Sequence, residues 1–201
     1  MVKYATLIVI VALILLSVLT LQFSKDSYKI LPIENSDPAK VDLEKYNFQD
    51  WKEFAPPSGK FQVMLPTVPQ QATENINDSE TGETRHYDMY VSERLDGTIF
   101  MISLITFETA PSKQEAERLL EDMMNDMVNS NPSNALENKS FGEYQGSPSL
   151  DFTITNTDIN INAKTFMTGK KMVVLTRVAP SSQNDPTEFN FFVNSFELRK
   201  Q

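Results

Sequence analysis

The 201-residue sequence contains no cysteine and a single histidine. Without cysteine the chain has no disulfide, no thiolate metal site, no cysteine nucleophile and no lipidated cysteine. With one histidine it cannot build an H-E-x-x-H zinc site, and any histidine-dependent triad would have to use His86. Its neighbours Arg85 and Tyr87 indicate nothing of this kind. We therefore expect His86 to be an exposed histidine on a strand.

Positive charge is also scarce, since 18 Lys and Arg residues stand against 27 Asp and Glu and the formal net charge is −9. Binding of nucleic acid requires a basic face that contacts phosphates, so this composition disfavours a nucleic-acid partner. Anionic lipid headgroups are disfavoured for the same reason.

Motifs that bind nucleotides or carry a nucleophilic serine are absent, because no G-x-S-x-G, G-x-G-x-x-G or G-x-x-x-x-G-K-[ST] occurs. One run has the spacing of a calcium loop, Asn156-x-Asp158-x-Asn160-x-Asn162. Its sixth position is Ile161 where Gly is needed, and its twelfth is Met167 where Glu is needed. We interpret it as a half-exposed strand. The sequence thus predicts no catalytic residue, no metal ligand and no cofactor.

A long apolar run opens the chain, in contrast to these absences. Residues 4–23 contain no charge, no Gly and no Pro. A bilayer core of roughly 30 Å needs about 20 such residues, whereas the apolar part of a signal peptide has about 7 to 15 and precedes a small-residue cleavage site, which is missing here. We predict that residues 1–23 form a signal anchor, a single transmembrane helix with its N-terminus in the cytoplasm. The alternative is a cleaved signal peptide.

Residues 24–50 contain Pro32, Pro38 and a polar run, with no sustained period of 2 or 3.6. Such a segment cannot bury enough surface to offset its ordering entropy, so we predict a flexible tether. A folded extracytoplasmic domain should then occupy residues 51–201.

Strand patterns begin near Trp51. The turn residues 56–59 separate two short apolar segments, and the second alternates from Phe61 to Leu65 before Pro66. Residues 86–95 and 98–107 predict a hairpin closed by Asp96-Gly97, a pair typical of a type I′ turn, in which both positions need φ > 0. Its second strand is apolar on both faces, which predicts a central strand covered on both sides.

The period then changes to that of a helix. Ser112-Lys113-Gln114-Glu115 has the form of a capping box. Apolar residues follow at helical spacing until residues 129–132 end the pattern: Ala116, Leu119, Leu120, Met123, Met124, Met127 and Val128. We expect this stripe to pack on the sheet, and we expect the carboxylates Glu117, Glu121, Asp122 and Asp126 to form a solvated face.

The C-terminal half returns to strand patterns at 141–144, 150–154, 159–168 and 172–178, with a turn at 145–148 and a hairpin around Gly169. Asp185-Pro186 predicts the start of a last helix. This order predicts an α+β fold, a mainly antiparallel sheet with helices packed on it.

Two patterns resemble the Mog1/PsbP-like superfamily. They are the opening Gly59-x-Phe61-x-Val63-x-x-Pro66-x-x-Pro69 and the closing Phe192-x-x-Ser195-Phe196-x-Leu198, and the similarity covers residues 51 to about 199. The resemblance implies an αβα sandwich that acts as a binding or accessory subunit. It transfers no functional residue, because the matching positions are structural and the superfamily shares no catalytic residues.

Three functions remain open on these grounds. The first is a noncatalytic, membrane-anchored domain that binds a protein or small ligand outside the cytoplasmic membrane, as an accessory of an envelope assembly. The second is an acid–base enzyme that uses Asp or Glu, which would require two carboxylates facing each other in a pocket. The third is a structural assembly protein, which would expose an apolar patch.

Overall fold

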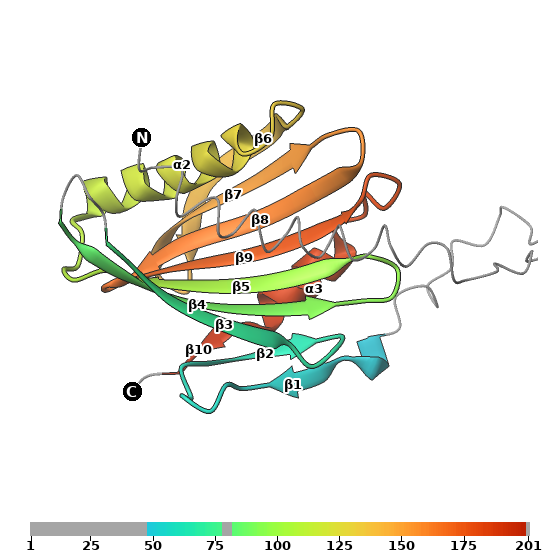
Figure 1. Cartoon of the computed structure of the whole chain (residues 1–201), viewed down its shortest axis with the longest axis horizontal. Helices are drawn as coiled ribbons and strands as arrows, with labels where there is room; N and C mark the ends of the chain where they lie inside the picture. The colour runs from blue at the N-terminus through green and yellow to red at the C-terminus, as the bar shows by residue number, and fades with distance from the viewer. Residues whose placement is uncertain (1–47, 78–81, 200–201) are drawn as a thin grey trace, which may run out of the picture.

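The computed structural model describes residues 48–77 and 82–199. Strands dominate this part of the chain and form two antiparallel sheets (Figure 1). The larger sheet has the strand order β3-β4-β5-β9-β8-β7-β6. Its strands are β3 (Gln70–Asn77), β4 (Thr84–Glu93), β5 (Ile99–Thr106), β6 (Ala135–Tyr144), β7 (Ser147–Thr155), β8 (Ile159–Thr168) and β9 (Lys171–Pro180).

The smaller sheet joins the two ends of the described chain. Its order is β1-β2-β10, with β1 (Lys52–Phe54) and β2 (Phe61–Leu65) forming a hairpin and β10 (Glu197–Leu198) pairing with β2. The connection from β1 to β2 turns at Gly59, whose φ is 62° and whose N–H donates to the Pro56 carbonyl at 2.8 Å. A positive φ favours glycine because it has no Cβ.

Helix α2 (Lys113–Asn129) covers one face of the larger sheet, and it packs mainly on β7 and β8. Ala116, Leu120, Met124 and Met127 are buried in this layer, as the helical period predicts. The Ser112 side chain accepts a hydrogen bond from the Glu115 N–H at 3.3 Å, which confirms the predicted N-cap. The layer also contains Leu150, Phe152, Ile154 and Val174 from the sheet.

The opposite face is covered by α3 (Thr187–Ser195) and by β2, so that the sheet lies between two layers. Phe61, Phe100, Phe166, Phe192 and Phe196 are each fully buried there. Strand β5 contributes side chains to both cores, which confirms its prediction as a central strand. The α+β class with helices packed on a mainly antiparallel sheet is confirmed as well.

Three local features differ from the sequence predictions. The β4–β5 turn is not type I′: of its residues only Gly97 has a positive φ, at 83°, and the Gly97 N–H donates to the Arg94 carbonyl at 3.0 Å. This is a type I turn followed by a bulge at Gly97, in which Asp96 instead uses its side chain to accept from the Thr98 N–H at 2.9 Å. Strands β3 and β10 were not predicted.

The folded part also begins earlier than Trp51. Residues Phe48–Asp50, which the sequence assigned to the tether, form a short 3-10 helix. The Phe48 ring stacks on Phe191 of α3 with centroids 4.0 Å apart and contacts Trp51 edge-on at 5.6 Å. The rest of the predicted tether and the predicted membrane span lie outside the described residues. Within residues 48–77 and 82–199, no helix is both long and apolar enough to cross a bilayer.

Candidate functional site

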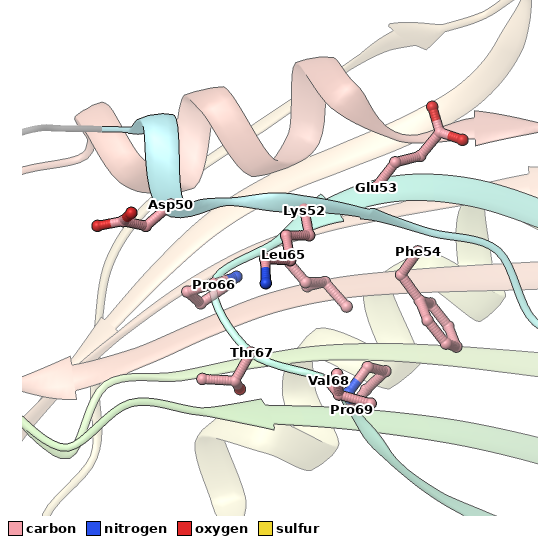
Figure 2. Close-up of a pocket in the computed structure, with 9 residues that line it drawn as sticks. All are labelled: Asp50, Lys52, Glu53, Phe54, Leu65, Pro66, Thr67, Val68 and Pro69. Atoms are coloured by element: carbon pink, nitrogen blue, oxygen red, sulfur yellow. The ribbon is translucent and has the colours of Figure 1, made fainter.

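A groove lies between strand β1 and the loop that follows β2 (Figure 2). Its volume is about 250 Å³. The lining residues come from one short stretch of chain, and they are Asp50, Lys52, Glu53, Phe54, Leu65, Pro66, Thr67, Val68 and Pro69. Pockets for drug-sized ligands usually measure about 300–1,000 Å³, so this groove is suited to one or two side chains.

Two segments of the backbone give the groove its shape, namely the β1–β2 hairpin and the loop 66–69. The loop is held on β4 by Thr67, whose N–H donates to the Ser92 hydroxyl at 3.2 Å. The Ser92 hydroxyl in turn donates to the Thr67 carbonyl at 3.0 Å. Pro66 and Pro69 flank this anchor and restrict φ on both sides of it. The loop is thus a stiff wall.

The groove combines an apolar floor with charges at its rim. Phe54 and the buried Leu65 provide the floor, and Val68 stands 85% exposed on the loop. Figure 2 shows Lys52 and Phe54 pointing from β1 toward the loop, whereas Glu53 points away, as alternation along a strand requires. A bound group that has an apolar part beside a carboxylate would therefore match both surfaces. Its apolar part would contact Phe54, and its carboxylate would face the Lys52 ammonium.

The floor is continuous with the aromatic core under it. Phe54 contacts Phe61 and Tyr90, with ring centroids 6.1 Å and 5.7 Å apart. Trp51, immediately before β1, contacts Phe100 with ring centroids 4.9 Å apart. Because core aromatics of this kind are close-packed, the β1 side of the groove is preformed.

A polar cluster surrounds the buried Asp88 in the middle of β4. The Lys60 ammonium is 2.5 Å from Asp88 Oδ2, and the Thr73 hydroxyl donates to Oδ1 at 3.1 Å. Burial alone would raise the pKa of Asp88, but the hydrogen bond and charge of Lys60, with smaller contributions from Thr73 and His86, outweigh it and lower this pKa. Asp88 therefore stays ionised.

His86 belongs to this cluster. It lies on β4 as predicted, with a side chain 37% exposed, and its Nε2 is 3.4 Å from Asp88 Oδ1. Its Nδ1 is 2.7 Å from Asn75 Oδ1. Both ring nitrogens thus face protein groups. The cluster was not predicted from the sequence because Lys60 and Thr73 come from other segments. His86 and Asp88, two residues apart on one face of a strand, were the local signal for it.

Tyr90 connects the cluster to the groove. Its ring lies against Phe54, and the Gln71 amide donates to its hydroxyl at 3.3 Å. Burial, followed by the Asp88 charge, raises the pKa of Tyr90. The cluster and the groove therefore share one face of β4, with Asp88, Tyr90 and Ser92 at alternate positions.

The chemistry that an acid–base enzyme would need is not assembled around Asp88. In the part of the chain that the structure describes, its side-chain contacts are the basic groups of Lys60 and His86 and the Thr73 hydroxyl. Among the described residues, no group of three or more His, Asp or Glu side chains could hold a metal ion. Asn156, from the rejected calcium loop, instead accepts from the backbone N–H groups of Asp158 and Ile159 at 2.8 and 2.9 Å, which forms a turn.

Another polar cluster, just after the C-terminal end of β4, has a structural role. Glu188, in the first turn of α3, accepts a hydrogen bond from Arg94, the residue that follows β4. Its carboxylate also lies 3.5 Å from the guanidinium of Arg177 on β9. Arg177 is only 2% exposed, and its burial lowers its pKa against the opposing effect of Glu188. The cluster fixes the start of α3 on the sheet. Two carboxylates of α2 form surface ion pairs: Asp122 lies 3.0 Å from Arg118, and Glu121 lies 2.6 Å from Lys139.

Comparison with known proteins gives a likeness in fold. No protein-family model and no curated protein matches the chain. The structure is similar to the solution structure of cyanobacterial PsbP (CyanoP) from Synechocystis sp. PCC 6803, with a TM-score of 0.46 and 11% identity over 84% of this chain and 100% of that chain. It is also similar to a crystal structure from Bacteroides thetaiotaomicron VPI-5482, with a TM-score of 0.37 and 17% identity over 76% of this chain and 50% of that chain. The PsbP-like fold predicted from the sequence agrees with the first of these, and the likeness concerns the fold alone.

Proposed function

We propose that this protein is a noncatalytic binding domain, held at the cytoplasmic membrane by residues 1–23 and exposed outside the cytoplasm. Its partner is a protein of the cell envelope, and the groove between β1 and the loop 66–69 receives a short extended segment of that partner. The observation that carries the proposal is the groove's composition, an apolar floor at Phe54 and Leu65 beside the Lys52 ammonium.

The position of β1 supports a peptide as the bound group. β1 is an edge strand of the smaller sheet, so its outer backbone groups can pair with an added strand. Side chains on one face of such a strand would then lie over the groove, because alternate residues point to the same side. A partner segment that carries a carboxylate near an apolar side chain would place the carboxylate at Lys52 and the apolar side chain on Phe54.

The test is capture of the partner from detergent-solubilised membranes with the full chain. Val68→Asp places a carboxylate on the loop wall, and Lys52→Glu reverses the rim charge, so each should reduce capture by about tenfold or more. Leu95→Asp is the matched control, because Leu95 is fully exposed on the β4–β5 turn and does not line the groove. A partner retained equally by Val68→Asp and by the unaltered chain would refute the groove as its site.

The membrane topology has its own test. Protease added to intact spheroplasts should digest the domain, because the proposal places it outside the cytoplasm. N-terminal sequencing of the mature protein should find residues 1–23 retained. A mature N-terminus near Ser24 would identify a cleaved signal peptide and contradict the anchor.

A further inference from the structure

Strand β6 (Ala135–Tyr144) forms one edge of the seven-stranded sheet and is exposed over nine of its ten residues. Phe141, near its C-terminal end, is 48% exposed. A long exposed edge strand offers unpaired backbone N–H and C=O groups to another strand. The pattern of side chains on this edge determines what can pair there.

The β6–β7 turn shows which residues direct their backbone groups outward. Gln145 and Gly146 have φ values of 51° and 75°, which is a two-residue type I′ turn closed by the pair Tyr144 and Ser147. Backbone groups of the closing pair point at each other, and the direction alternates along the strand. The N–H and C=O groups of Glu143, Phe141 and Lys139 therefore point away from β7.

We propose that β6 pairs antiparallel with β6 of a second copy of this chain, with the two-fold axis at Phe141. In this register the two Phe141 residues lie opposite each other as a hydrogen-bonded pair, and the exposed rings cover one another. Lys139 of each copy, which pairs with Glu121 of α2 in its own chain, lies opposite Glu143 of the other. The edge is thus self-complementary in backbone, in apolar contact and in charge, as an isologous interface requires.

Neighbouring registers lack this complementarity. An axis at Ser140 places Glu143 opposite Glu137 of the second copy, and an axis at Lys139 places two ammonium groups opposite each other. Like charges directly across a strand pair are destabilising. The register shift between Leu136 and Asn138 also interrupts the edge at its N-terminal end, which confines regular pairing to the part that contains Phe141.

Helix α2 leaves room for the second copy. Its main packing is on β7 and β8, and it also contacts β6 through the Glu121–Lys139 pair. In the dimer the two β7 strands are three strand spacings apart, about 14 Å, which exceeds the roughly 10–12 Å diameter of a helix. The paired segment is short, so the interface is below about 1,200 Å² and a dissociation constant in the micromolar range is expected.

The absence of cysteine makes the register directly testable in the full chain in its membrane. With Phe141→Cys, the two thiols lie across the axis with Cα atoms about 5.5 Å apart, within disulfide range, so an added oxidant should give a cross-linked dimer. Ser140→Cys places the thiol on the other face and away from its copy, and Leu95→Cys lies on a remote turn. Neither should cross-link comparably. Equal cross-linking of Ser140→Cys and Phe141→Cys would refute the register.

Charge exchange tests the same edge without a cross-link. Glu143→Lys should weaken dimerisation of the detergent-solubilised full chain by about tenfold. Lys139→Glu should do the same when it is combined with Glu121→Lys, which keeps the pair within the chain. All three changes together should restore dimerisation, because they re-form both cross-strand pairs with exchanged signs. Analytical ultracentrifugation provides the measurement. A chain that stays monomeric up to about 100 µM, well above a micromolar dissociation constant, would overturn the proposal. So would a charge-reversed chain, Glu143→Lys or Lys139→Glu with Glu121→Lys, that dimerises as the unaltered chain does.

Discussion

The ion pair between Lys60 and Asp88 allows a stability prediction whose size follows from burial. The Asp88 side chain is 6% exposed and that of Lys60 24%. Lys60→Met retains the aliphatic stem but removes the ammonium, leaving a buried carboxylate with Thr73 and His86 as its remaining contacts. Removing one partner of a fully buried pair costs about 3–5 kcal/mol, and a hydrogen bond to a charged group contributes about 1.5–3. Because Lys60 is partly exposed, we expect a loss of about 2 kcal/mol.

The pH dependence of this loss has a definite sign. The folded state lowers the pKa of Asp88, so the pair's contribution to stability is present above the unfolded-state pKa of about 3.9 and is lost as pH falls toward the folded-state value. The difference between the unaltered protein and Lys60→Met should therefore be complete at pH 7. It should shrink as pH falls through the usual carboxyl range, because Asp88 is protonated first in Lys60→Met, where burial is no longer opposed by Lys60. It should vanish only below the lowered pKa of Asp88 in the unaltered protein.

Urea unfolding at pH 7 and near pH 3 measures both quantities. Arg118→Met is the matched control, since it removes a cation from an exposed pair in which both side chains are about half accessible, at 63% and 47%. That change should cost no more than about 1 kcal/mol. A loss for Lys60→Met below about 0.5 kcal/mol at pH 7 would refute the reasoning. A loss that is unchanged near pH 3 would show that packing of the stem, and not the charge, is what Lys60 contributes.

Two further predictions concern the α2 face and the start of the domain. Leu120→Ala should cost about 2–5 kcal/mol in urea unfolding, because Leu120 is fully buried against the sheet, whereas Glu117→Gln on the exposed face should change stability by no more than about 0.5 kcal/mol. A soluble form beginning at Phe48 should unfold within about 5 °C of one beginning at Ser24, because residues 24–47 lack core periodicity. A larger drop in the thermal midpoint would show that residues 24–47 stabilise the domain.

The sequence predicted those elements whose own side chains supply the core. Helix α2 was found because its apolar period and its Ser112 cap are both local signals. Strand β5 was found because it is apolar on both faces. The turn at Asp96-Gly97 was placed correctly and typed wrongly, because Asp96 can bond the Thr98 N–H from a negative φ and leave only Gly97 at a positive one.

The missed strands are those that other segments hold in place. β3 is mostly exposed and polar, so its side chains give no alternation, and its extended form comes from eight residue pairs with β4. β10 has two residues, and it pairs with β2 from the other end of the chain. For the same reason the Lys60–Asp88 contact, which spans 28 residues, could not be read from local pattern.

The two faces of β4 divide the molecule into a part that stabilises it and a part that positions the groove. Tyr87 packs under α2, whereas Asp88 and Ser92 face the hairpin side. Asp88 holds Lys60 at the start of β2, and Ser92 holds Thr67 just after its end. The hairpin that forms one wall of the groove is therefore fixed at both ends of β2 by polar contacts to a single strand. Polar contacts depend on direction more strongly than apolar ones do, so they set the position of this hairpin on the sheet. The aromatic core beneath the hairpin supplies most of the free energy that holds the two layers together.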